Sequence, residues 1–232
     1  MAWRRALLDA LLPRRCLGCR RRGAWMCAAC SGHVHKLRPP VCDLCGREIA
    51  ARQRCQACAR QPPKWAGMRA AARYELLLRE AIHSLKYAGH RGLAVELAAW
   101  LEVAAAAYVD QVEVLVPVPL HPARERARGY NQSALLAREL GQRCHLPVEG
   151  ELLARVVDTR DQVKLTRAER QRNVRGAFAC THANAVAGRS LLLVDDVCTT
   201  GSTLLACAAA LTAAGAGSVR AVVLARQDAA RE

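Results

Sequence analysis

The sequence predicts an α/β protein with a largely parallel sheet flanked by helices, preceded by a small cysteine-rich module. Strand-like and helix-like segments alternate through the last two thirds of the chain, one apolar strand runs into two adjacent acids, and four C-x-x-C pairs lie near the start. The chain has 232 residues and contains no apolar run long enough to cross a bilayer. We therefore expect a cytoplasmic protein with no membrane span.

The cysteine-rich module occupies residues 1–60, where the four pairs predict two metal sites. A C-x-x-C turn presents two thiolates to one tetrahedral ion, and two turns complete a four-cysteine site of the kind that holds structural Zn²⁺. Disulfides, redox-active pairs and iron–sulfur ligation are the alternatives; the first residues do not resemble a secretory signal, which favours reduced thiols. Pro39 and Pro40 favour sequential sites over a cross-braced arrangement. The predicted ligands are Cys16, Cys19, Cys27 and Cys30, then Cys42, Cys45, Cys55 and Cys58.

The rest of the chain divides into a linker over residues 61–75, rich in turn-forming and stiffening residues, and a domain over residues 76–232. The expected elements, in order, are helical structure over 76–108, a strand over 112–119, a helix over 132–143, strands over 152–157, 177–179 and 191–195, a helix over 204–214 and a strand over 219–225. This alternation predicts a doubly wound sheet with its ligand site at the carboxyl edge.

The segment from Leu191 to Thr203 indicates the ligand. Four apolar residues form a buried strand, and Asp195 and Asp196 emerge at its carboxyl end. In the loop behind them, backbone N–H groups, hydroxyls and the dipole of the following helix converge at a point that suits a phosphate. The paired carboxylates suit a vicinal diol or Mg²⁺ instead, so the whole segment indicates a ribose phosphate. The loop residues are Thr199, Thr200, Gly201, Ser202 and Thr203.

This segment resembles the phosphoribosyl pyrophosphate (PRPP) binding motif of type I phosphoribosyltransferases. The resemblance implies the type I phosphoribosyltransferase fold, with Asp195 and Asp196 holding the ribose hydroxyls and the loop 199–203 wrapping the 5-phosphate. It also implies that Mg²⁺ accompanies PRPP.

Further stretches resemble one branch, the ComF family, and the resemblance covers nearly the whole chain. They are the cysteine-rich head, Leu85-Lys86-Tyr87 followed by Gly89, Val116 to His121 continuing to Arg128-Gly-Tyr-Asn-Gln132, and Gln162 to Phe178. That family includes competence and DNA-utilisation proteins, so the resemblance implies a part in natural transformation or in the use of imported single-stranded DNA. It also has members with a single zinc site.

A pyrophosphate leaving group gathers negative charge and needs cations around it. The resemblance places Arg128 in the pyrophosphate loop and Arg170 in the mobile flap as the strongest candidates for that role. Lys86 and Tyr87 either pack at a helix end or contact the pyrophosphate or the partner in a homodimer.

The positive charge is concentrated at the start of the chain. Residues 1–60 hold thirteen Lys or Arg and three Asp or Glu, a formal charge of +10 out of the total of +15, and two bound Zn²⁺ with eight thiolates would leave about +6. This excess suits single-stranded DNA, with Trp3, Trp25 and Trp65 as stacking candidates. A solvated arginine-rich surface, with Trp25 and Trp65 packed in a small core, is an equally open interpretation.

Three functions remain open from the sequence. The first is a phosphoribosyltransferase that transfers ribose phosphate to an unidentified acceptor and releases pyrophosphate. The second is a non-catalytic PRPP-sensing adaptor whose zinc head binds single-stranded DNA, a DNA-uptake helicase or a recombination protein. The third is a purely structural interaction module. We also expect Cys42→Ser to release about one zinc and to leave PRPP binding by the distal domain intact.

Overall fold

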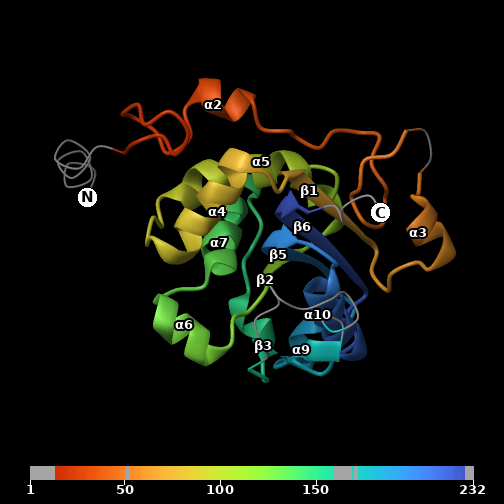
Figure 1. The fold of residues 1–232 in the computed structure, drawn as a ribbon. Coiled ribbons are helices and arrows are strands. Elements are labelled where there is room, and N and C mark those ends of the chain that lie inside the picture. Colours follow the sequence, from red (N-terminus) through yellow and green to blue (C-terminus); the bar gives the residue numbers. More distant parts are fainter. Residues whose placement is uncertain (1–13, 51–52, 159–168, 170–171, 228–232) are drawn as a thin grey trace.

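The computed structural model describes residues 14–50, 53–158, 169 and 172–227, and its centre is a parallel four-stranded sheet (Figure 1). The strand order is β1-β6-β5-β2. Strand β5 pairs with β2 on one side and β6 on the other, and its apolar run 191–194 is fully buried, as expected for a strand covered on both faces. The strands are β1 (Gly67–Arg73), β2 (Val114–Pro117), β5 (Ser190–Cys198) and β6 (Ser218–Arg226).

Helices cover both faces of the sheet, which confirms the doubly wound architecture (Figure 1). Leu192 and Val194 of β5 belong to the hydrophobic core beneath one helical layer, whereas Leu191 and Leu193 belong to the core on the other face. This alternation follows from the two-residue period of a strand. The first layer contains α4 (Leu76–Tyr87), α5 (Leu93–Ala105) and α7 (Gln132–Cys144), and the second contains α9 (Ala183–Val186) and α10 (Ser202–Ala213).

One expected helical stretch differs in detail. The helical stretch 76–108 is divided into α4 and α5 by residues 88–92, where Gly89 has a φ of +69° that favours glycine. A short 3₁₀ helix, η1 (Val109–Gln111), follows α5.

The strands β3 (Leu153–Arg155) and β4 (Phe178–Cys180) form a separate antiparallel pair instead of joining the parallel sheet, which corrects the sequence prediction. Residues 147–149 lie along the outer edge of β2: Leu115 donates to the carbonyl of Pro147 at 2.9 Å and accepts from Glu149 N at 3.0 Å. Because this edge is already hydrogen-bonded, β3 cannot extend the sheet there. Two short helices, α6 (Pro122–Arg128) and η2 (Gly150–Leu152), complete this end of the domain.

The expected linker is the second correction, because residues 67–73 form β1 of the main sheet. Strand β1 pairs with β6 on its inner edge. On its outer edge, Leu37 N donates to the carbonyl of Ala71 at 3.0 Å, and Arg73 N donates to the carbonyl of His35 at 2.9 Å. The connection between the two cysteine clusters therefore covers the edge of the sheet.

The cysteine-rich region forms two ribbons at opposite sides of the molecule (Figure 1). The first ribbon (residues 16–30) leads into α2 (Ala28–Gly32) and packs on the layer of α4 and α5 through Leu17, Trp25 and Met26. The second ribbon (residues 42–58) leads into α3 (Gln56–Arg60) and lies beside β1 and β6. None of the helices in the described part of the chain has the length and hydrophobicity needed to cross a bilayer.

Candidate functional site

Two buried carboxylates lie near the carboxyl end of β5, where the sequence predicts them. Asp195 and Asp196 are 8% and 3% exposed. The Ser133 hydroxyl donates to Asp195 Oδ1 at 2.8 Å, and the backbone N–H of Asp196 donates to the same oxygen at 2.9 Å. The Lys86 ammonium lies 2.8 Å from Asp196 Oδ2. Helix α4 thus supplies a cation to the acid pair, and the first turn of α7 supplies a hydroxyl.

The pKa values of Asp195 and Lys86 are both raised in this cluster. Burial, followed by the neighbouring charge of Asp196, raises the pKa of Asp195 to about 7, although Ser133 and Lys86 oppose the shift. Burial alone would lower the pKa of Lys86, but the charge and hydrogen bond of Asp196 outweigh it and raise that pKa. The lysine is therefore a permanent cation beside the acid pair.

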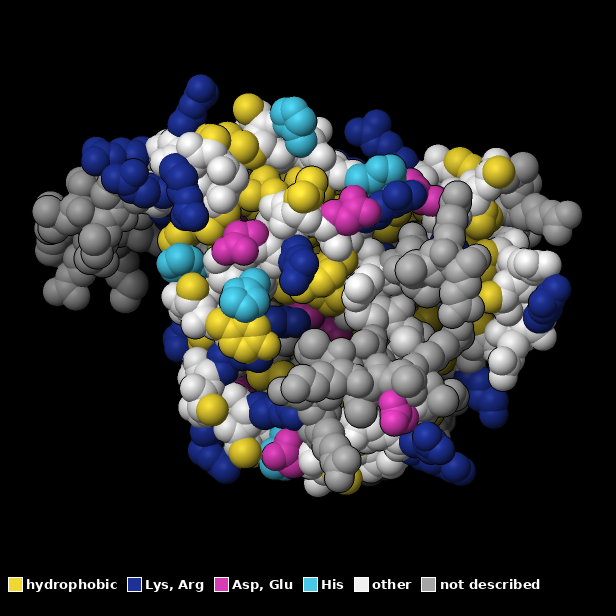
Figure 2. All heavy atoms as spheres, viewed as in Figure 1, with side chains coloured by type: hydrophobic (Ala, Val, Ile, Leu, Met, Phe, Trp, Pro, Cys, Tyr) yellow, Lys and Arg dark blue, Asp and Glu magenta, His cyan; other side chains and the backbone are white. Residues whose placement is uncertain are grey.

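The acids form part of the wall of a cavity of about 530 Å³, and the other charged residues among its described lining are all basic. Figure 2 shows acidic side chains deep in a recess near the middle of one face, with Lys and Arg side chains beside it. Arg128 donates to Gln132 Oε1 and lies over the ring of Tyr87, 5.1 Å from its centroid. Tyr87 is itself 66% exposed. The basic lining residues are Arg79, Lys86, Arg124, Arg128 and Arg155.

The loop 199–203 closes the same end of the sheet. Gly201 has a φ of +80° and directly precedes α10, while the hydroxyls of Thr200 and Ser202 lie 2.8 Å apart. Thr199 and Thr203 border the large cavity, and residues 197–204 also surround a smaller hollow of about 30 Å³. The N-terminus of α10 therefore faces the space beside the acids, where its dipole favours an anion.

The structure brings together most of the residues that the sequence singles out: the acid pair, Lys86, Tyr87, Arg128 and the loop. Arg170 lies outside the described residues. The sequence did not single out three further residues of the site: Ser133, Arg79 and Arg155. For Ser133 the sequence did hold a signal, namely the helix-capping residue Asn131 two positions before it. The Asn131 side chain caps α7 by accepting from Ser133 N at 2.9 Å.

The eight predicted metal ligands form two groups in the sequential pairing: Cys16, Cys19, Cys27 and Cys30, then Cys42, Cys45, Cys55 and Cys58. Within each group the sulfur atoms lie within 4.8 Å of one another. A tetrahedron with zinc–sulfur bonds of about 2.3 Å separates its sulfurs by about 3.8 Å. The Cys19–Cys27 and Cys45–Cys55 sulfur pairs, 3.6 and 3.7 Å apart, agree with this spacing. The two groups thus fit structural zinc.

The local electrostatics favour a thiolate at one cysteine of each group, Cys16 in the first and Cys42 in the second. Burial tends to raise the pKa of Cys16, but backbone N–H groups, including those of Cys19 and Cys27, outweigh it and lower that pKa to about 6. The pKa of Cys42 is lowered to about 7 in the same way, against the effect of burial. Each ribbon therefore holds one sulfur that is ready to ligate a metal near neutral pH.

Two family models match the chain: the Double zinc ribbon domain over residues 7–59 and the Phosphoribosyl transferase domain over residues 133–232. Together with the parallel sheet and the two four-cysteine groups, these matches define a protein of the phosphoribosyltransferase fold that carries an N-terminal double zinc ribbon.

More specifically, the chain belongs to the ComF family. It is 32% identical to Competence protein F of Haemophilus influenzae, over 82% of this chain and 87% of the relative. It is also 32% identical to DNA utilization protein YhgH of Escherichia coli, over 93% and 98% of the two chains. Competence protein ComFC of Bacillus subtilis is 27% identical, over 77% of this chain and 74% of the relative.

Among solved structures, a glutamine PRPP amidotransferase from B. subtilis aligns at a TM-score of 0.39 with 21% identity. The alignment covers 56% of this chain and 25% of that chain.

Proposed function

We propose that the chain binds PRPP together with Mg²⁺ in the cavity beside Asp195 and Asp196. The observation that carries this proposal is the juxtaposition of a buried carboxylate pair, five basic residues and the N-terminus of α10 around one cavity. Carboxylate oxygens suit ribose hydroxyls or a hard cation, the loop 199–203 suits a phosphate, and the arginines suit a pyrophosphate. PRPP carries all of these groups in one molecule.

Each residue has a distinct part in this proposal. The loop 199–203 holds the 5-phosphate through backbone N–H groups and hydroxyls, and the acid pair orients the ribose. Lys86 and Arg128 face the pyrophosphate, and the resemblance to type I phosphoribosyltransferases implies the same role for Arg170. If the protein is an enzyme, an acceptor nitrogen attacks C1 of the ribose and pyrophosphate leaves, so these cations stabilise the charge that develops on the leaving group. Mg²⁺ would supply further neutralisation of that charge.

Calorimetric titration with PRPP and Mg²⁺ tests the site. We expect the wild-type protein to bind and the Asp195→Asn, Asp196→Asn double variant to lose at least about tenfold in affinity, about 1.4 kcal/mol. Inorganic sulfate at the same concentration controls for general anion binding. Equal affinity of the two proteins for PRPP would contradict the proposal.

The proposed setting is the uptake or use of foreign DNA, as the names of the relatives suggest. Charge supports a second candidate, a non-catalytic adaptor that senses PRPP and binds single-stranded DNA through its head. Four arginines around the first ribbon are exposed: Arg15, Arg20, Arg21 and Arg22. Trp25 and Trp65 are half-buried in the packing of the two ribbons, so stacking on bases is not part of this candidate.

Pyrophosphate release separates the two candidates. An enzyme releases pyrophosphate when PRPP is mixed with the correct nitrogenous acceptor, whereas the adaptor binds PRPP without turnover. The adaptor also predicts strongly salt-dependent binding of single-stranded DNA that survives the double substitution at the acid pair. DNA binding that is lost with this substitution, or that is insensitive to salt, would argue against the adaptor.

A further inference from the structure

The knuckle of the second ribbon, residues 42–45 (the third knuckle of the chain), is held by three side chains of the distal domain. Arg69 donates to the carbonyls of its first two residues, at 3.4 and 3.1 Å. Trp65 donates from its indole to the third carbonyl at 2.6 Å, and Arg226 donates to the fourth at 2.5 Å. All four carbonyls of the knuckle are therefore bound by residues of β1, β6 or the segment that leads into β1.

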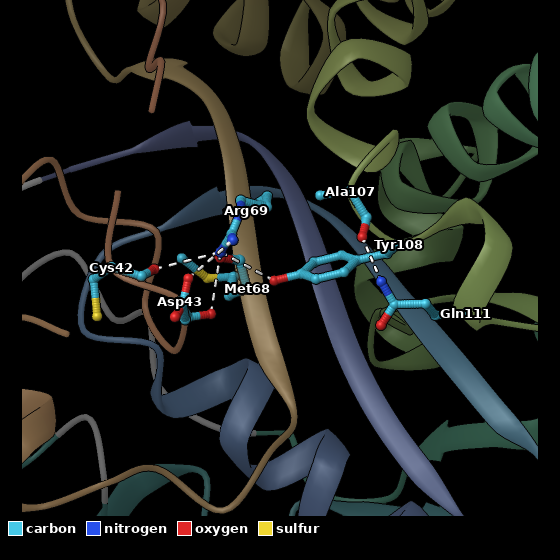
Figure 3. A network of polar contacts seen from close by, with 7 residues as sticks. All are labelled: Cys42, Asp43, Met68, Arg69, Ala107, Tyr108 and Gln111. Carbon is cyan, nitrogen blue, oxygen red and sulfur yellow. Dashed lines mark hydrogen bonds and ion pairs between the residues drawn. The ribbon is translucent and has the colours of Figure 1, made fainter. Parts of the chain in front are cut away.

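Arg69 is fixed in turn by its surroundings (Figure 3). It donates to the hydroxyl of Tyr108 at 3.2 Å, and its guanidinium lies 5.4 Å from the centroid of that ring. Arg220 of β6 lies at 5.6 Å from the same ring. The knuckle lies close to the backbone of β1, because a Cβ atom at Gly67 would lie 2.8 Å from the carbonyl oxygen of Asp43. The second ribbon is thus a packed part of the distal domain.

Trp65 also reaches the proposed phosphate loop, and Arg226 reaches Cys198, the residue before that loop. A Cβ atom at Gly201 would lie 3.3 Å from Cη2 of Trp65, so the indole packs directly on the loop backbone at its left-handed residue. Arg226 lies 3.9 Å from the sulfur of Cys198, the residue beside it on β5. Trp65 and Arg226 each contact the third knuckle on one side and the end of β5 or its loop on the other.

The knuckle needs its metal to hold this geometry. The buried core of the second ribbon consists of Leu44 and three of its own ligands, Cys42, Cys55 and Cys58. So small a core does not stabilise a fold by burial alone, and ribbons of this kind depend on the metal. Without zinc, the array of four carbonyls would be lost and Trp65 would lose its acceptor.

The first ribbon provides a natural comparison. Glu96 of α5 accepts from the backbone N–H groups of Trp25 and Met26 at 3.1 and 3.0 Å, and Trp25 stacks on His90 with a centroid distance of 4.2 Å. These contacts attach the first ribbon to α5 and to the α4–α5 connection, on the opposite side of the sheet from α10 (Figure 1).

We propose that Trp65 and Arg226 are positioning residues that connect the second zinc site to the loop 199–203, so that zinc in this site and phosphate in the loop stabilise each other. This coupling concerns the proposed PRPP site and rests on it. It reverses the expectation that loss of the second zinc leaves PRPP binding intact. Because coupling between two binding sites is reciprocal, PRPP must raise the affinity for this zinc by the same factor by which this zinc raises the affinity for PRPP.

Hydrogen exchange of the full-length, two-zinc protein tests the connection without any ligand. Trp65→Phe removes the indole N–H and the ring carbon that touches the loop, while Trp25→Phe is the matched change in the first ribbon. We expect amide exchange in residues 199–205 to become at least about tenfold faster in Trp65→Phe and to stay unchanged in Trp25→Phe. Equal exchange of this loop in both variants, with both zinc ions retained, overturns the proposal. If Trp65→Phe loses metal, Arg226→Lys replaces it in the same comparison.

A second measurement follows zinc transfer to a chelator by native mass spectrometry, with and without PRPP and Mg²⁺. We expect PRPP to slow the loss of one zinc by at least about tenfold, and exchange data on the one-zinc species to place that ion in the second ribbon. Equal slowing of both ions, or slowing only of the first, contradicts the proposal. If the wild-type protein does not bind PRPP, the PRPP site fails, and the ligand-free exchange comparison still decides whether the ribbon supports the loop.

Discussion

Lys86→Met is expected to lower the free energy of unfolding by about 3–5 kcal/mol at pH 8, because it leaves buried carboxylates without their cation. The Lys86 ammonium lies 2.8 Å from Asp196 Oδ2, and the two side chains are 22% and 5% exposed. At that distance and an effective dielectric constant of about 20, the attraction is about 6 kcal/mol. Part of it offsets the cost of removing both ions from water, so the expected loss is smaller.

The loss depends on pH in a defined direction. The pKa of Lys86 is raised above its ordinary value of 10.5, so its contribution is present across the range from pH 5 to 9. Lys86 lowers the pKa of Asp195, so without the lysine that pKa moves further upward in the folded state. When a carboxyl has a raised pKa in the folded state, the protein loses stability as the pH rises through that value. The pKa of Asp195 is already about 7. The destabilisation should therefore be smaller at pH 5.5 than at pH 8.

Urea unfolding of both proteins at pH 5.5 and pH 8 measures this difference, with Arg143→Met as the control. Arg143 and Glu102 form an ion pair at 2.9 Å, but their side chains are 34% and 43% exposed, so its removal should cost less than about 1 kcal/mol. Adding Asp196→Asn to Lys86→Met should restore part of the loss. If Lys86→Met costs no more than Arg143→Met at pH 8, the reasoning from a buried ion pair is refuted.

Three further predictions concern the site and the ribbons. Ser133→Ala leaves a buried oxygen of Asp195 without its hydroxyl donor and should cost about 1–3 kcal/mol in thermal unfolding; an unchanged melting temperature would count against that hydrogen bond. Affinity for PRPP with Mg²⁺ should rise between pH 6 and pH 8, because the pKa of Asp195 is raised to about 7 and the ionised pair binds better, whereas affinity that calorimetry finds constant would exclude this titration. Elemental analysis should find two zinc ions per chain and about one in Cys30→Ser; two ions in that variant would contradict the first site.

Local features of the sequence predicted local features of the structure. The spacing of each cysteine cluster sets its own geometry, so the sequential pairing could be inferred from C-x-x-C pairs and the intervening prolines. The strand that ends in Asp195 and Asp196 could be inferred because its apolar run is continuous and the following loop leads into a helix.

The features that the sequence did not reveal depend on residues far apart in the chain. Strand β1 has the sequence Gly-Met-Arg-Ala-Ala-Ala-Arg, with no β-branched residue, and becomes a strand because β6 and the segment 35–37 lie on either side of it. Ser133 contacts Asp195 across 62 positions, and Arg226 contacts Cys45 across 181. Such pairings follow from the packing of the whole domain, and no local pattern encodes them.

The hydrogen-bonded edges of β1 limit where the chain can be cut. A fragment that starts at residue 76 would lack β1 and expose the backbone groups of β6 that pair with it. A fragment that starts at Gly67 would retain β1 but expose the groups that pair with His35 and Leu37. Open edges of this kind recruit strands from neighbouring molecules, so both fragments should aggregate when expressed. The shortest fragment that keeps the sheet closed starts ahead of His35, and it carries the second ribbon with it.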